Sequence, residues 1–235
     1  MSAHPVLPIV PIGPRPDWVQ MLRAFLLSLV FATPSGNANT AAGVRSPVPD
    51  AAAAADFQRL ILPHLDAAYS LARYLTRDAI ASDDIVQEAY LKAFRHFSGF
   101  RGGDPRAWIL TIVRNTTRDW QASQRMERRY IAPLPIASDD EDLRPDAIET
   151  IAAEIESAEA MLERDGEDRR IRAVIELIPD RLREVLVLRE MEDLSYREIA
   201  DITQLPIGTV MSRLARARDV FSKIWRRLET GKGAR

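Results

Sequence analysis

Apolar residues recur at intervals of three and four from residue 56 onward, and no convincing run alternates apolar with polar residues. The first spacing places side chains on one face of a helix, whereas a half-buried strand needs a period of two. We therefore expect an all-α fold. Glycines and Pro105 interrupt the pattern at 99–105, and Pro179 interrupts it again. The helices predicted in this way span residues 56–76, 83–98, 105–124, 168–178, 181–191, 195–203 and 208–227.

Charge is distributed unevenly, although the formal net charge of the 235-residue chain is only -2. Residues 95–129 carry eight Arg against three acidic residues, and residues 208–235 carry eight Lys or Arg against two. Between them, residues 139–168 hold thirteen Asp or Glu against two Arg. The pattern indicates two basic lobes and an acidic connector. By itself it fits solvated helix faces as well as nucleic-acid binding.

The first 55 residues contain more than half of the prolines and a Ser/Gly/Asn/Ala-rich stretch. Such a composition builds no core, so we expect residues 1–55 to be disordered. The apolar stretch 18–32 resembles the core of a signal peptide and is too short to cross a bilayer, which needs about 20 residues. If translation began at Val44, this apolar stretch would not be part of the protein. We expect a dispensable or misassigned extension on a cytoplasmic protein that makes no membrane contact of its own.

The region near residue 200 has the pattern of a helix-turn-helix. Ser195 and Glu198 form a capping-box pair that begins a helix, and residues 204–206 end it. Gly208 and Thr209 begin a second helix directly afterwards. Two short helices across a tight turn are the arrangement in which the second helix enters the major groove of DNA.

The second of these helices has one apolar arc, at residues 210, 214, 217 and 221, with Ser212, Arg216 and Asp219 opposite. A recognition helix needs one anchored face and an opposite face that offers guanidinium groups to guanine and phosphate. The alternative is an ordinary helical hairpin with solvated arginines. The expected DNA-contacting residues here are Thr209, Met211, Ser212, Arg213, Arg216 and Arg218.

The predicted helix 83–98 has an informative outer face. Its buried arc should comprise residues 85, 86, 89, 90, 93 and 97. Leu91 lies opposite this arc among polar residues, as expected of a surface that docks onto another protein, although one exposed leucine alone carries little weight. The expected docking residues are Asp84, Gln87, Glu88, Leu91 and Arg95.

The predicted helix 105–124 places residues 108, 109, 112, 113 and 120 on its apolar side. Arg114 and Arg118 stand one turn apart on the expected polar side, where they can straddle a phosphate backbone. Asn115 and Asp119 form a second such pair, suited either to reading a base or to supporting the helix. Aromatic residues at 97, 100 and 108 surround a glycine-rich loop and could stack on unpaired bases, with core packing as the alternative.

The sequence contains no pattern of a metal site or an enzyme. It has no cysteine, and its three histidines, His4, His64 and His96, are widely separated. No phosphate-binding glycine loop of the Walker type occurs, nor a nucleophile with a base partner. We expect no metal, no cofactor and no catalysis.

Residues 56–228 resemble the extracytoplasmic-function (ECF) sigma factors, the smallest members of the bacterial sigma superfamily. Segment 83–94 is similar to the family helix that docks on the clamp of the polymerase beta-prime subunit. Segments 100–103, 106–108 and 114–115 are similar to the loop and helix that melt and read the minus-ten element. Segments 178–179, 194–200 and 207–218 look like the reader of the minus-thirty-five element, although Met211 stands where members often have a polar or basic residue.

The resemblance implies two small helical domains joined by a flexible acidic linker at 125–167 and followed by a tail at 229–235. A sigma region 2 domain would span 56–124, and a region 4 helix-turn-helix domain would span 168–228. The implied partners are core RNA polymerase, through its beta-prime clamp and beta flap, promoter DNA, and an anti-sigma factor. The implied DNA contacts of the first domain are Arg101, Arg106, Arg114, Asn115, Arg118 and Asp119.

Two other functions fit parts of the sequence. A dimeric regulator would use the helix-turn-helix for output and residues 56–124 for sensing or dimerisation, but the docking helix argues against it. A sigma mimic would sequester an anti-sigma factor without directing transcription, but the Arg-rich helices argue against that.

The composition of the N-terminal extension predicts that it contributes nothing to promoter activity. Deleting residues 1 to 50 should leave run-off transcription with core polymerase unchanged. A truncated protein that folds, as judged by circular dichroism, yet loses transcription would contradict this expectation.

Overall fold

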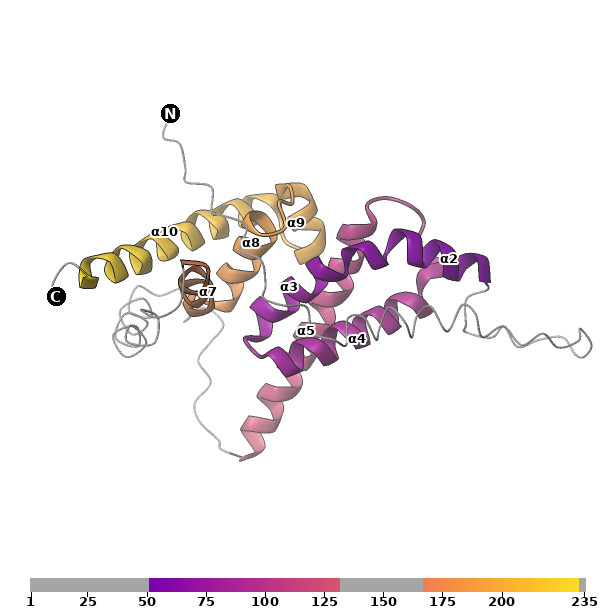
Figure 1. Ribbon diagram of the computed structural model, residues 1–235, viewed down its shortest axis with the longest axis horizontal. Coiled ribbons are helices and arrows are strands. Elements are labelled where there is room, and N and C mark those ends of the chain that lie inside the picture. Colours follow the sequence, from indigo (N-terminus) through magenta and orange to yellow (C-terminus); the bar gives the residue numbers. More distant parts are fainter. Residues whose placement is uncertain (1–50, 132–166, 233–235) are drawn as a thin grey trace, which may run out of the picture. The chain divides into compact units, whose positions relative to one another are not determined.

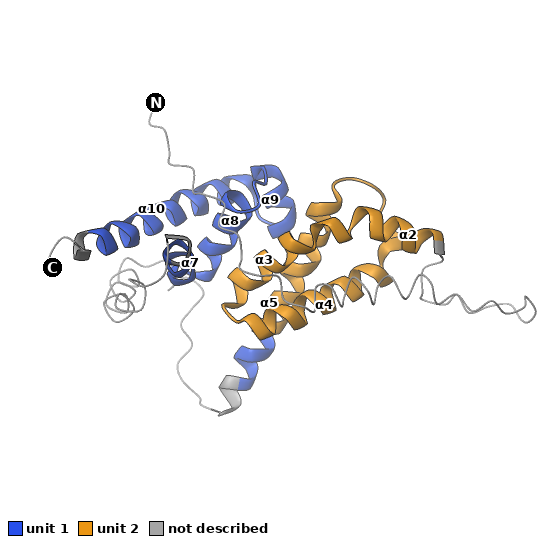
Figure 2. Ribbon diagram, in the orientation of Figure 1, with its two compact units in different colours: residues 1–12, 122–235 blue, residues 13–121 orange. Residues whose placement is uncertain are grey.

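The computed structural model describes residues 51–131 and 167–232, and within these ranges the regular structure is entirely helical (Figure 1). The chain divides into two compact units, with the division inside α5 after Gln121 (Figure 2). The unit drawn in orange comes first along the described chain and is called the first unit below, and the blue one is called the second unit. These observations confirm the all-α fold class.

The first unit contains three helices and two short 3-10 turns before its last helix. The elements are α2 (Ala51–Leu60), η1 (Leu62–His64), α3 (Leu65–Thr76), α4 (Ala79–Arg95), η2 (Phe97–Gly99) and α5 (Pro105–Ile131). The expected single helix 56–76 is interrupted at η1, where Pro63 lacks the amide hydrogen that a continuous helix needs. Helix α2 begins at Ala51, and Ala54 is buried, so the prediction that residues 51–55 are disordered is wrong. The rest of that extension lies outside the described residues.

Side-chain capping fixes where α4 begins. Asp78 Oδ1 accepts hydrogen bonds from the amides of Ile80 (2.8 Å) and Ala81 (3.1 Å), so the helix starts four residues before the expected position. Helix α5 extends beyond its expected end at residue 124, so residues 125–131, expected in the linker, are helical. Residues 132–166 of the expected linker lie outside the described residues.

An aromatic cluster holds α2 against α4. The ring of Phe57 makes edge contacts with Tyr90, Phe94 and Phe97, at centroid distances of 6.3, 5.2 and 5.3 Å. The Tyr90 hydroxyl donates to the carbonyl oxygen of Ile61 at 3.3 Å. Burial, with a smaller contribution from Asp66, raises the pKa of Tyr90, so this group stays a protonated donor. On the other side, Gln121 donates to the carbonyl of Leu75 at 3.0 Å and ties α5 to α3.

The second unit comprises α7 (Glu167–Leu177), α8 (Asp180–Glu190), α9 (Tyr196–Thr203) and α10 (Ile207–Lys232). The capping box is confirmed: the Ser195 hydroxyl accepts from the Glu198 amide at 3.3 Å, and the Ser195 amide donates to the Glu198 carboxylate at 2.7 Å. Gln204, in the left-handed region with a φ of 57°, ends α9 and opens the tight turn into α10.

A buried arginine that the sequence analysis did not single out joins the first two helices of this unit. The Arg183 guanidinium donates to the carbonyl oxygens of Glu176 and Ile178, each at 3.0 Å, and pairs with Asp180. Its side chain is only 1% exposed. It therefore satisfies carbonyls at the end of α7 that the helix itself cannot satisfy.

Replacing Arg183 by Met should destabilise the second unit by about 3 kcal/mol, because buried carbonyls and Asp180 lose a charged donor. Hydrogen exchange measured by mass spectrometry should show faster exchange across α7 and α8, with little change in α3 and α4. Arg197→Met, at an exposed position on α9, serves as the control. Equal protection in the two variants would contradict the role given to Arg183.

Candidate nucleic-acid and polymerase interfaces

Helix α10 turns its apolar arc inward and a polar face outward, as expected. Val210, Leu214, Ala217 and Phe221 are buried. On the opposite side, Ser212, Arg216 and Asp219 are exposed. Together with α9 and the tight turn at Gln204, this arrangement presents the outer face of α10 at the surface. It is the geometry of a helix that can enter a major groove.

The three arginines of α10 that were expected to contact DNA differ in their surroundings. Arg216 is exposed, and its side chain makes no hydrogen bond or ion pair within the described parts of the chain. Arg218 is different, because its Nε (2.9 Å) and Nη2 (2.6 Å) both donate to Glu190 Oε1 on α8. Arg213 is half-buried. Arg218 therefore stands on the flank that faces α8 and holds the two helices together, and its expected contact with DNA stays a prediction.

The outer face of α4 forms a shallow groove. All five residues expected to dock line this groove. Lys92, which the sequence analysis did not include, lines it as well. Leu91 is half-buried in this lining, and the ammonium group of Lys92 lies 2.8 Å from a carboxylate oxygen of Glu88. The buried arc of α4 is confirmed. The residues that line the groove are Asp84, Gln87, Glu88, Leu91, Lys92 and Arg95.

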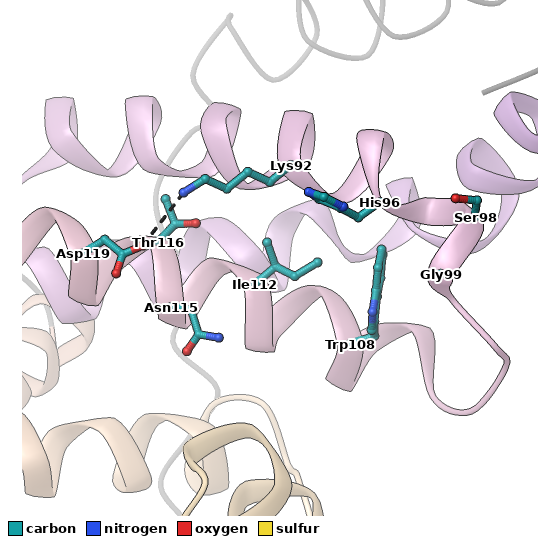
Figure 3. A pocket seen from close by; sticks show the side chains of 9 residues that line it. All are labelled: Lys92, His96, Ser98, Gly99, Trp108, Ile112, Asn115, Thr116 and Asp119. Atoms are coloured by element: carbon teal, nitrogen blue, oxygen red, sulfur yellow. Dashed lines mark ion pairs between the residues drawn. The ribbon is translucent and has the colours of Figure 1, made fainter. Parts of the chain in front are cut away.

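A second groove, of about 620 Å³, runs between the end of α4 and α5 (Figure 3). It brings together Asn115 and Asp119, the pair singled out in the sequence, and places Trp108 and His96 farther along the same opening. Lys92 reaches across from α4, with its ammonium group 4.0 Å from Asp119 Oδ2. The groove thus offers an amide, a carboxylate, an imidazole and an aromatic ring to one ligand.

The faces of α5 are rotated relative to the prediction. Arg114 is only 4% exposed, and its guanidinium donates to Asn115 Oδ1 at 3.2 Å, so it does not stand outward beside Arg118. Position 114 lies one turn from Leu110 and from Thr117, both fully buried, and this places its side chain on the packed face. Arg118 is exposed, as expected. Ile112, expected in the core, is half-buried and lines the second groove.

The loop before α5 combines aromatic packing with positive charge. Phe100 and Trp108 are half-buried, and their ring centroids lie 5.2 Å apart, while Phe97 belongs to the core. Gly102 and Gly103 have φ values of 90° and 101°, a region that favours glycine. Arg101 is exposed and Arg106 is half-buried. Nearby, burial first and the charge of Arg106 second lower the pKa of His64.

The described residues contain neither a metal-binding cluster nor a membrane-spanning helix. Residues 51–131 and 167–232 contain no group of three or more His, Cys, Asp or Glu side chains able to hold a metal ion. No helix in these ranges is long and apolar enough to span a membrane.

Comparisons with known proteins place both units in the same family. Residues 60–127 match the family model described as sigma-70 region 2, and residues 168–219 match that of sigma-70 region 4. The RNA polymerase sigma-H factor of Pseudomonas aeruginosa is 34% identical over 168 residues, 71% of this chain and 84% of that protein. The ECF RNA polymerase sigma-E factor of Escherichia coli is 36% identical over 141 residues, 59% of this chain and 70% of that protein. The chain belongs to the ECF sigma factors.

A solved structure is similar in fold. It is the sigma factor RpoE of Bartonella quintana, in complex with the anti-sigma factor NepR, with a TM-score of 0.55 and 22% sequence identity. The match covers 73% of this chain and 97% of that one. As an ECF sigma factor, the protein binds core RNA polymerase and directs promoter recognition, strand opening and transcription initiation. Members of this family are initiation factors rather than enzymes.

The different surroundings of Arg216 and Arg218 predict different defects. Arg216→Ala should lower transcription from the best promoter roughly tenfold, and much less from a promoter mutated in its minus-thirty-five element, if its exposed guanidinium group contacts a guanine as the sequence predicts. Arg218→Ala should lower both alike, because it frees Glu190 and loosens α10. In vitro transcription from the two templates gives both ratios. Equal losses in Arg216→Ala would reassign that residue to the phosphate backbone.

Proposed function

We propose that this sigma factor divides its work between the two units, and that α4 is the element that connects polymerase binding to DNA opening. The observation that supports this is the position of Lys92, which lines both grooves of the first unit. One groove holds the residues expected to dock on polymerase. The other holds Asn115 and Asp119, two of the residues expected to contact DNA. A helix clamped on one side by polymerase would hold the base-binding groove at a fixed place relative to the active site.

The groove between α4 and α5 would accept an unpaired base of the minus-ten element. The amide of Asn115 and the carboxylate of Asp119 can hydrogen-bond a base edge, and Trp108 offers a ring for stacking. Extruding a base costs a few kcal/mol, which such contacts offset. The exposed guanidinium groups of Arg101 and Arg118 would attract the phosphate backbone. Binding alone opens the duplex in this scheme, so the chain itself catalyses no reaction.

The outer face of α10 would read the minus-thirty-five element as duplex DNA. Arg216, exposed opposite the buried arc, would contact guanine in the major groove. Thr209, Ser212 and Arg213 lie on or beside the same face and would position the helix. In this assignment residues 51–131 carry the work of region 2 and residues 167–232 that of region 4, close to the boundaries inferred from the sequence.

We further propose that a cytoplasmic anti-sigma factor silences the protein by covering the docking groove of α4. The solved relative is a complex of a sigma factor with an anti-sigma factor, which supports this form of control. Leu91 gives the groove an apolar centre surrounded by charged side chains, and this combination suits a protein-binding surface.

Leu91→Glu tests the docking groove. The change should weaken binding to core polymerase at least tenfold, because it places a carboxylate beside Glu88 at the centre of the contact. The first unit should stay folded, since Leu91 lies outside the buried arc. The affinity can be measured by fluorescence anisotropy of the labelled full chain titrated with core polymerase.

Ile80→Glu is the matched control, because Ile80 lies on the same helix, is 77% exposed and does not line the groove. It should bind polymerase as the unchanged protein does. Equal weakening in both variants would remove the groove from the interface. Specific binding of the chain to a promoter duplex without polymerase would favour the dimeric-regulator alternative.

A further inference from the structure

Two large apolar side chains are exposed at the start of α10. Ile207 is 47% exposed and Met211 is 51% exposed. They are four residues apart, so they are neighbours on the surface of the helix. The sequence reading named Met211 and missed Ile207, although the four-residue spacing signals the pair. Single exposed apolar residues are common, but this pair occupies the N-terminal part of the helix, which in this motif contacts base edges.

Short side chains separate this apolar pair from the guanidinium group. Gly208, Ser212 and Ala215 are all exposed on the outer face of α10. At about 100° per residue, Met211 and Arg216 lie about 140° apart around the axis, with these short residues between them. A Cβ atom added at Gly208 would meet nothing within 4 Å, so the first turn is open on this side. The middle of the face therefore lets the helix approach the floor of a groove, with Met211 at one edge and Arg216 at the other.

We propose that Met211, supported by Ile207, is a specificity-determining residue that reads the C5-methyl group of thymine in the minus-thirty-five element. This rests on the proposed function of α10. Thymine presents a methyl group in the major groove, and apolar side chains contact it there. A thioether is neither a donor nor a strong acceptor, so it cannot read the hydrogen-bonding edges of the other bases well.

The charge around the pair favours duplex DNA as its occupant over an apolar protein partner. Arg216 and Arg197 are both exposed, on α10 and α9 respectively, and such a cationic surface attracts a phosphate backbone. The two side chains then have complementary roles, because Arg216 selects guanine through hydrogen bonds and Met211 selects thymine through apolar contact. The promoter element should accordingly contain both base types within the reach of one helix.

The test removes single methyl groups from the DNA. The best promoter is selected from a library randomised in the upstream element, and each thymine of that element, on either strand, is replaced in turn by deoxyuridine. Binding of the full holoenzyme is measured on each duplex. At one or two positions the loss of the methyl group should weaken binding about fourfold, as expected for one buried methyl-sized group.

Variants at position 211 assign the effect to the side chain. Met211→Ala should lose the sensitivity to deoxyuridine, and Met211→Gln should shift the preference at that position towards adenine, whose edge a glutamine can pair. Met126→Ala is the matched control, because Met126 is also exposed (54%) but lies on α5, outside the helix-turn-helix. This control should keep the full sensitivity.

The proposal is overturned if no deoxyuridine substitution weakens binding, if the sensitivity persists in Met211→Ala, or if Met211→Ala weakens binding to core polymerase in the absence of DNA. The last result would assign the pair to a protein interface. Failure of the proposed function looks different, because the holoenzyme would then show no preference for any upstream sequence.

Discussion

Burial of one apolar face on each of α4 and α10 is the constraint on which the rest of this structure depends. Helices of this length are marginal alone and gain their stability from packing. Once Ile85 and Tyr90 face the core on α4, Leu91 must face away, and once Val210 and Leu214 are buried on α10, Arg216 must face away. The functional faces are thus fixed by the core, and a substitution on them can change binding while leaving the fold intact.

The contrast between buried and outward-facing sides of these helices also explains how much the sequence could predict. Strong amphipathic patterns predicted the fold class, the buried arcs of α4 and α10 and the polar residues around Leu91, and the Ser195 and Glu198 pair predicted the capping box. The sequence reading also missed the structural contacts of several arginines. Arg114 is buried, Arg218 pairs with Glu190, and Arg183 satisfies carbonyls at the end of α7. Periodicity assigns every arginine to the surface, so it cannot distinguish a structural arginine from one offered to DNA.

Contacts between helices could not be predicted from the sequence either. The second groove depends on how α4 and α5 pack, and that packing brings Lys92 within 4.0 Å of Asp119, twenty-seven positions along the chain. The pair of Asn115 and Asp119 was visible as a helical spacing, but only the structure joins it to His96 and Trp108. The second groove is therefore an assembly of residues from two helices.

The most direct test of this account is transcription in vitro by purified core polymerase, with and without the full chain, on a pool of promoter fragments. Sequencing the 5′ ends of the transcripts identifies each start site. The account predicts that the chain adds a discrete set of start sites whose upstream regions share two sequence elements, at the minus-ten and minus-thirty-five positions. An identical set of start sites with and without the chain would contradict it.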